Sequence, residues 1–387
     1  MLAGALTIVP ACGTPPPPPS LGDEPGLGGG GAQSGPPDGS VLAFTTKPTP
    51  PPGCGVGPTG GVCDCVDQPL LTDVPTMYFI LDRSGSMNES NKWPTITTVL
   101  GATVTRIGPR SNFGLALFPD PTAGNETCNA GVEVMPVRPG DPSNTQGRTY
   151  SILDEELKIH APGGGTPTAS TLSALLPELR ALPGRTFAIL ATDGGPNCNP
   201  SLSCSIDQCI ANIEGSVNTA CAPNVAPNCC DRTGVAGPIN CLDGAATIAM
   251  VTEYKAAGIP VYVLGVPGSG PYAALLDQLA TAGGTARASE PLYYSVDTPD
   301  ETAFTSALSQ IAAKITASCT LTLKAPPSDP TLVNVYLDEV AVPPDPTNGW
   351  LLQDATVTLL GATCQSVLSG QSLDVRVIEG CPTIPLK

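Results

Sequence analysis

The chain has little of several residue types that common functions require. Its 387 residues include one histidine, His160, which leaves no basis for a zinc site built on histidines. Lysine and arginine number 17 against 34 acidic residues, a formal net charge of −17, so nucleic-acid phosphates would be repelled. No run of 18 or more apolar residues occurs, so we expect no transmembrane helix.

Cysteine is abundant by contrast. Fifteen cysteines are too many for a reducing cytoplasm and indicate an exported protein. The apolar segment 2–9 leads into Pro10-Ala11-Cys12, which is similar to the end of a bacterial lipoprotein signal, where the cysteine is lipidated. No lysine or arginine precedes that segment, a departure from the signal pattern, so an ordinary cleaved signal peptide is the alternative. Lipidation of Cys12 would leave an even number of cysteines to pair.

The segment 13–72 is rich in proline and glycine and has almost no hydrophobic periodicity. Such a composition cannot bury enough apolar surface to fold, so we predict a disordered stalk. Its last cysteines, Cys54, Cys63 and Cys65, are expected to tie the stalk to the domain that follows.

The stretch 77–87 carries the chemistry around which the chain is organised. Met77 to Leu81 form an unbroken apolar run, which is typical of a strand buried on both faces of a parallel sheet. Asp82, Ser84 and Ser86 follow at alternate positions, so a carboxylate and two hydroxyls can turn inward together. Oxygen donors of this kind are the ligands that Mg²⁺ prefers. A simple Asx or serine turn is the alternative interpretation.

This Asp-x-Ser-x-Ser stretch resembles the metal-ion-dependent adhesion site (MIDAS) of von Willebrand factor A-type (VWA) domains. Two further segments follow in the family's order, since 163–168 looks like the threonine loop and 188–195 looks like the strand that carries the second aspartate. The resemblance implies a Mg²⁺ site, with Mn²⁺ or Ca²⁺ as alternatives, and the ligands Asp82, Ser84, Ser86, Thr166 and Asp193.

Each of the last two ligands has a plainer interpretation. Thr166 precedes Pro167 and a helical pattern, so it is also predicted to be the N-cap of that helix. Asp193 precedes two glycines, as a turn aspartate would. The resemblance favours a ligand role for both.

Strand and helix patterns alternate through residues 73–317, which predicts an α/β fold with a doubly wound, mostly parallel sheet, as the VWA resemblance also implies. Asp82 and Asp193 both end strands, where such sheets bind ligands. Besides 77–81, the expected strands are 113–118, 131–137, 185–192, 260–266 and 292–296, and the expected helices are 93–107, 167–179, 245–257, 272–282 and 299–317.

A cysteine-rich insertion, residues 195–242, interrupts this pattern directly after Asp193. Its low apolar content means that disulfides must supply most of its order, each contributing about 2–4 kcal/mol. The alternative, a zinc knuckle, lacks paired Cys-x-x-Cys units. Because the number of cysteines is odd, at least one pairs outside the insertion, stays free or links to another chain; the seven are Cys198, Cys204, Cys209, Cys221, Cys229, Cys230 and Cys241. The insertion is expected near the metal edge, where it would shape ligand choice.

Residues 318–387 change to the alternating pattern of strands, which predicts a small β-rich module that packs as an accessory. We expect a disulfide between Cys364 and Cys381, and Cys319 to reach back to the preceding domain. The predicted organisation is therefore a signal segment 1–12, a stalk 13–72, a VWA domain 73–317 and a β-rich module 318–387.

These features predict a non-enzymatic, metal-dependent protein-binding or adhesion module on the cell envelope, exported as a bacterial outer-membrane or surface lipoprotein or secreted. In the family that the chain resembles, the metal bridges to an acidic residue of a partner protein. Two protein carboxylates roughly neutralise the charge of the ion. One coordination position of the ion stays open, and the carboxylate of a partner would fill it. The alternative is a disulfide-stapled envelope scaffold in which the metal serves stability only. Catalysis is not expected, because Asp82 and Asp193 would be occupied as ligands and His160 has no evident nucleophile partner.

Overall fold

The computed structural model describes residues 74–123, 128–142, 144–215, 221–372 and 374–383, together with the backbone of the short strand β1 (Val66–Asp67). The predicted signal segment with Cys12 lies outside the described residues, as do Cys54, Cys63 and Cys65 of the stalk. Within the described residues, no helix is long and apolar enough to cross a membrane.

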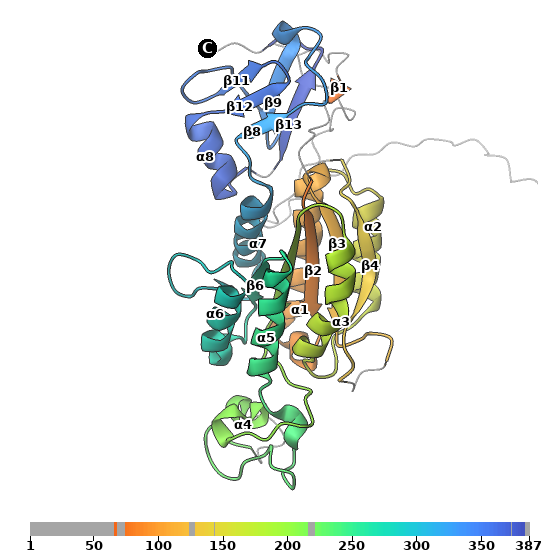
Figure 1. Ribbon diagram of the computed structural model, residues 1–387, viewed down its shortest axis with the longest axis vertical. Helices are drawn as coiled ribbons and strands as arrows, with labels where there is room; N and C mark the ends of the chain where they lie inside the picture. Colours follow the sequence, from red (N-terminus) through yellow and green to blue (C-terminus); the bar gives the residue numbers. More distant parts are fainter. Residues whose placement is uncertain are drawn as a thin grey trace, which may run out of the picture. The chain divides into compact units, whose positions relative to one another are not determined.

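The central layer is a six-stranded sheet in the order β4-β3-β2-β5-β6-β7 (Figure 1). All neighbours pair in parallel except the edge strand β4, which runs antiparallel to β3. Every residue of β2 is buried, as its apolar run predicts. The strands are β2 (Thr76–Asp82), β3 (Asn112–Phe118), β4 (Val132–Pro139), β5 (Thr186–Thr192), β6 (Val261–Gly265) and β7 (Tyr294–Ser295).

Helices cover both faces of this sheet. Alternate side chains of β2 point to opposite faces: Phe79 joins a core with α1 and α7, and Ile80 joins a second core with α3, α5 and α6. Two cores on one sheet confirm the predicted doubly wound α/β fold. The helices are α1 (Lys92–Ile107), α2 (Arg148–Ile159), α3 (Thr168–Ala181), α5 (Gly244–Ala256), α6 (Ala273–Ala282) and α7 (Glu301–Thr316).

Two local predictions differ from the structure. Helix α2 was not expected, although its buried residues Thr149, Leu153 and Leu157 recur at the helical spacing of four. Helix α3 begins at Thr168 with Pro167 in the cap position, so the predicted N-cap role of Thr166 is wrong. The loop conformation that precedes the helix leaves the Thr166 side chain available for other contacts.

Disulfides hold the insertion, whose one α-helix among the described residues is α4 (Ile210–Glu214). Six of its cysteines pair internally, as Cys204–Cys241, Cys209–Cys230 and Cys221–Cys229, and Cys198 pairs outside it with Cys128. The odd cysteine therefore takes the first of the three predicted alternatives. The sulfurs of Cys204, Cys230 and Cys241 lie within 4.8 Å of one another, but all three belong to disulfides and are not zinc ligands.

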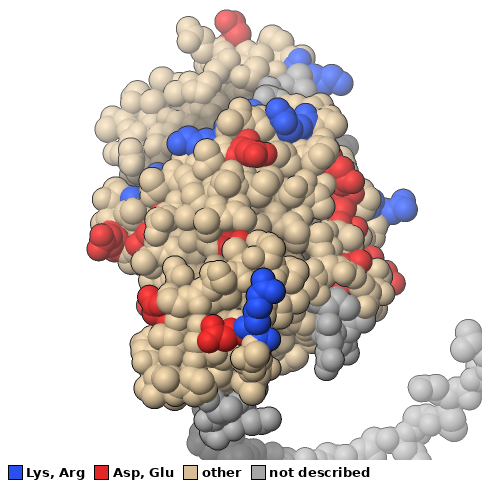
Figure 2. Space-filling model, turned by 60° about the horizontal axis from the view of Figure 1, so that its bottom comes forward, with Lys and Arg blue, Asp and Glu red and all other residues tan. Residues whose placement is uncertain are grey.

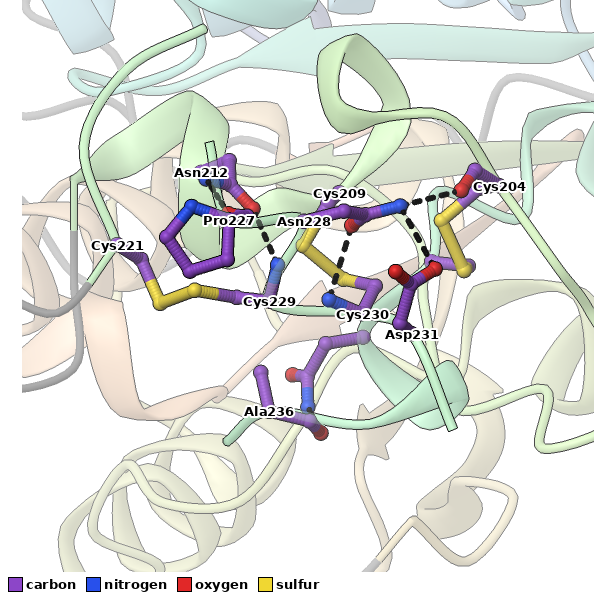
Figure 3. The surroundings of a disulfide bond; sticks show 12 residues. Cys204, Cys209, Asn212, Cys221, Pro227, Asn228, Cys229, Cys230, Asp231 and Ala236 are labelled. Carbon is purple, nitrogen blue, oxygen red and sulfur yellow. Dashed lines mark hydrogen bonds between the residues drawn. A yellow bond between two sulfur atoms is a disulfide. The ribbon is translucent and has the colours of Figure 1, made fainter. Parts of the chain in front are cut away.

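Asn212 organises the interior of the insertion (Figure 3). Its side chain is fully buried, and its Nδ2 donates to the carbonyl oxygens of Ala222, Val225 and Pro227 at 3.2–3.3 Å. Its Oδ1 accepts from the Cys229 amide at 2.9 Å. One amide side chain thus satisfies four backbone groups in a segment that has almost no regular structure.

Residues 318–383 form two small antiparallel sheets, as the alternating pattern predicts, with the unpredicted helix α8 (Gly361–Ser369). The strand orders are β1-β13-β9-β10, in which β1 (Val66–Asp67) comes from the segment before the central domain, and β11-β12-β8. Their common core includes Leu321, Val335 and Trp350. The strands are β8 (Thr320–Thr322), β9 (Val333–Leu337), β10 (Val340–Val342), β11 (Trp350–Gln353), β12 (Thr356–Leu359) and β13 (Val375–Glu379).

Both disulfide predictions for this region are wrong. Cys319 pairs with Cys364, with a Cα–Cα distance of 5.3 Å, so Cys364 is not the partner of Cys381, and Cys319 does not reach back to the preceding domain. The reason is α8, which carries Cys364 and follows the strand β12 that pairs with β8 beside Cys319. Cys381 is itself disulfide-bonded.

Candidate metal centre

Two neighbouring strands deliver the two aspartates to one edge of the sheet. Strand β2 ends at Asp82, and β5, which pairs with it in parallel, ends at Thr192 immediately before Asp193. The Thr192 hydroxyl donates to Asp82 Oδ2 at 2.6 Å and so locks the two strand ends together. The carboxyl ends of parallel strands are where such sheets place their ligand sites.

Ser84 and Ser86 link the two carboxylates. The Ser84 amide donates to Asp82 Oδ1 at 2.7 Å, and the two serine hydroxyl oxygens lie 3.1 Å apart. The Ser86 hydroxyl donates to Asp193 Oδ1 at 2.8 Å. Four of the five predicted ligands therefore form one continuous set of hydrogen-bonding contacts.

Thr166 comes from the glycine-rich loop that precedes α3. That loop is fixed to the first segment, because the Gly163 amide donates to the Arg83 carbonyl at 2.6 Å and the Gly85 amide to the Gly164 carbonyl at 3.0 Å. A methyl group added at Gly194 would lie 3.9 Å from Thr166 Oγ1 and 4.0 Å from Ser86 Oγ. The two hydroxyls thus lie near one common point, and the structure brings all five predicted residues together.

The electrostatics of this cluster favour a bound cation. Burial raises the pKa of Asp82, and the nearby charge of Asp193 raises it further, against the hydrogen bonds from Thr192 and Ser84. Burial also raises the pKa of Asp193, against the contacts with Lys92 and Ser86. Two buried carboxylates, hydroxyl donors and neither histidine nor thiolate fit a hard divalent ion such as Mg²⁺.

Lys92 is a member of the site that the sequence did not single out. Its side chain is buried, and its ammonium nitrogen lies 2.7 Å from Asp193 Oδ2 and 3.1 Å from the Ser86 carbonyl oxygen. Gly268, at a φ of +108°, leaves the room that this group needs, since a Cβ there would lie 3.0 Å from Nζ. No spacing rule in the sequence marks the lysine at the start of a helix as buried.

Arg83 and Met87 flank the ligands, and both side chains are directed inward. Arg83 is 2 % exposed; its Nε and Nη2 donate to the Ala161 carbonyl at 2.9 and 2.5 Å, and its Nη1 to the Pro119 carbonyl at 3.1 Å. Met87 lies in the core. Arg83 therefore positions the loops that carry the ligands. His160 lies apart from this network, with its Nε2 at 3.2 Å from Glu156.

The insertion begins at the same edge. The Asn197 side chain accepts from the Thr166 amide at 2.7 Å, and Cys198 Sγ lies 2.6 Å from where a Cβ on Gly165 would be. The disulfide Cys128–Cys198 thus packs against the threonine loop.

The face turned forward in Figure 2 is mostly uncharged in its described part, with isolated basic and acidic side chains and no basic patch.

Comparisons with known proteins give likenesses of fold only. No known family profile matches the chain, and no curated protein matches its sequence. The pilus adhesin SpaC from Lactobacillus rhamnosus GG is 17% identical with a TM-score of 0.46, over 81% of this chain and 40% of that one. The vWF domain of the pili tip protein Mfa5 from Porphyromonas gingivalis is 14% identical with a TM-score of 0.41, over 65% of this chain and 97% of that one.

The manganese-loaded TRAP protein from Plasmodium vivax is 15% identical with a TM-score of 0.39, over 63% of this chain and 76% of that one. This chain spans about 40% of the length of the pilus adhesin. At identities and TM-scores this low, the likenesses carry no argument about what this chain binds.

Proposed function

We propose that the chain is a non-enzymatic, divalent-metal-dependent protein-binding or adhesion module of the cell envelope. The observation that carries the proposal is the meeting of Asp82, Ser84, Ser86, Thr166 and Asp193 at one sheet edge. These are the residues that the three-segment resemblance to a MIDAS assigns as ligands. Mg²⁺ is the proposed ion, with Mn²⁺ or Ca²⁺ as alternatives.

The metal would act as a Lewis acid that accepts an oxygen of a partner's carboxylate. Asp82 and Asp193 contribute two negative charges, Lys92 contributes one positive charge, and the divalent ion adds two more. The loaded site therefore keeps a net positive charge, so an acidic residue of a partner protein is the fitting ligand. Binding is favoured over catalysis because both carboxylates are engaged, which leaves neither to act as a general base.

We further propose export, with lipidation of Cys12 as the anchor. The paired cysteines support an oxidising compartment, since disulfides persist outside the cytoplasm. A secreted form without the lipid is the alternative. Either form would present the site to other proteins, and the net charge of −17 argues against nucleic acid as the partner.

The test is calorimetric titration of the full chain with Mg²⁺ and Mn²⁺, beside the Asp82→Asn variant. We expect binding to the natural chain and none to the variant, while Asp207→Asn, an exposed aspartate of the insertion, serves as the matched control. Acetate or a glutamate-containing peptide should strengthen metal binding. Equal binding by the natural chain and Asp82→Asn would contradict the site.

A scaffold role is the second candidate, favoured by the five disulfides among the described residues. In that case the metal would raise the thermal stability of the chain and change nothing else. A pull-down from envelope extracts, with and without chelator, separates the two candidates. Partners that are lost with chelator support the adhesion module, and partners that are retained support the scaffold.

A further inference from the structure

The ammonium group of Lys92 contacts both segments that supply the aspartates and serines. It lies 2.7 Å from Asp193 Oδ2 and 3.1 Å from the carbonyl oxygen of Ser86. Its side chain is 5 % exposed and that of Asp193 is 0 % exposed, so water screens their attraction little. Glu89 is the other acidic contact, at 3.8 Å, but its side chain is 73 % exposed and contributes little.

The surroundings of Lys92 keep its ammonium at this place. Lys92 begins α1 directly after the serine loop, and Gly268 of the loop after β6 leaves the space that its Nζ occupies. A buried ion pair gives little net stability, because removing both charges from water costs nearly as much as their attraction returns. A gain in stability is therefore a weak explanation for a lysine at this position. The effect of Lys92 on the metal ligands is the stronger explanation.

Counting charges shows what that effect is. When both carboxylates are ionised, Asp82, Asp193 and Lys92 sum to one negative charge without metal. With a divalent ion the sum is one positive charge, and with a bound carboxylate it is zero. Without Lys92 the same three sums are two negative charges, zero and one negative charge. Lys92 therefore opposes the ion and favours the anion.

We propose that Lys92 is the specificity-determining residue of this site. Its ammonium group neutralises the charge of Asp193 and weakens metal binding, so that tight binding of the metal depends on a carboxylate ligand. The inference rests on the proposed function and refines it. Metal and carboxylate become coupled ligands, each raising the affinity for the other, and this coupling is reciprocal by thermodynamic linkage.

The experiment is calorimetric titration of the full chain with Mn²⁺, with and without saturating acetate, for the natural chain and Lys92→Met. We expect Lys92→Met to bind Mn²⁺ at least about tenfold more tightly without acetate, because a positive charge beside the ligands is gone. Acetate should raise the Mn²⁺ affinity of the natural chain and leave that of Lys92→Met unchanged. Lys158→Met, whose side chain is 72 % exposed, is the matched control and should behave as the natural chain.

A second measurement needs no metal. A double-mutant cycle of Lys92→Met and Asp193→Asn, followed by denaturant unfolding with chelator, measures the coupling of the pair. We expect Asp193→Asn to restore most of the stability that Lys92→Met loses. If Lys92→Met does not fold, Lys92→Gln, which keeps a donor without the charge, replaces it in both measurements.

The outcomes separate the two ideas. No Mn²⁺ binding by any variant, with acetate present, overturns the proposed function and the metal part of this inference, while the cycle still decides whether the pair is coupled. Mn²⁺ binding by the natural chain with the same affinity and acetate dependence in Lys92→Met overturns the inference and leaves the proposed function standing. Absence of coupling in the cycle also overturns it.

Discussion

Arg83 donates two hydrogen bonds to the carbonyl oxygen of Ala161, a residue 78 positions further along the chain. A third bond, from Nη1 to the Pro119 carbonyl, ties the loop after β3 to the same side chain. The planar guanidinium can reach both carbonyls at once because its donors point in fixed directions. The ligand-bearing loops after β2 and before α3 are therefore held in register by the residue next to Asp82.

Replacing Arg83 with lysine should loosen the threonine loop. The three N–H donors of a lysine ammonium share one nitrogen and cannot reach the Ala161 and Pro119 carbonyls together, so at least one of these two bonds is lost, at a cost of about 1–3 kcal/mol. We expect a lower unfolding free energy and weaker Mn²⁺ binding, measured by denaturant unfolding and calorimetry. Arg232→Lys, at an exposed position of the insertion, is the control. Unaltered metal affinity in Arg83→Lys would show that the loops do not depend on Arg83.

The disulfide between Cys128 and Cys198 should matter for both stability and the site. It closes a sequence separation of 70 residues, and both sulfurs pack beside Gly165 of the threonine loop. Converting both cysteines to serine should cost about 2–4 kcal/mol of unfolding free energy and lower the metal affinity. The Cys319 and Cys364 pair offers the matched control, because its double serine variant should lose stability without a change in metal binding.

Asn212 should decide whether the insertion folds as a unit. Its four hydrogen bonds are made by one fully buried side chain, so Asn212→Ala removes three part-buried bonds to carbonyl groups and one buried bond from the Cys229 amide. We expect faster amide hydrogen exchange across residues 204–241, with the exchange of the central sheet unchanged. Thr233→Ala, at an exposed position of the same insertion, is the comparison. Equal protection in the two variants would mean that the disulfides alone order the segment.

The sheet and the meeting of Asp82 and Asp193 were predictable because their signals are local, whereas the place of Thr166 beside them was implied only by the VWA resemblance. An apolar run followed by Asp82 marks a buried strand and its carboxyl end, and Thr192 before Asp193 repeats that pattern. Parallel strands bring such ends to one edge whatever lies between them. The metal itself and the anchor at Cys12 stay predictions.

The features that were missed depend on contacts between distant residues. The link from Lys92 to Asp193 spans 101 positions, and no periodicity marks a lysine as buried. Disulfide pairing depends on which elements lie side by side, so Cys319 could not be matched to Cys364 without knowledge of α8. Helix α2 went unpredicted because only three of its residues are buried.

The stability of the metal-free protein should fall as the pH rises from about 4, because the folded state binds the proton of the Asp82 carboxyl more tightly than the unfolded chain does. Burial and the charge of Asp193 raise the pKa of Asp82 above its value of about 4 in the unfolded chain. Between these two values the folded state binds more protons than the unfolded state, so the unfolding free energy decreases with pH. For each unit by which folding raises the pKa, the unfolding free energy falls by about 1.4 kcal/mol as the pH rises through this range.

Asp82→Asn has no carboxyl at this place and should show a smaller decrease. The measurement is denaturant unfolding of both chains in metal-free buffer at several pH values from about 4 to 7, with Asp207→Asn as the control. The stability gained by Asp82→Asn should grow as the pH rises and should vanish when Mg²⁺ is added, because the ion stabilises the ionised carboxylates of the natural chain. A gain that is constant over this range would contradict a raised pKa at Asp82.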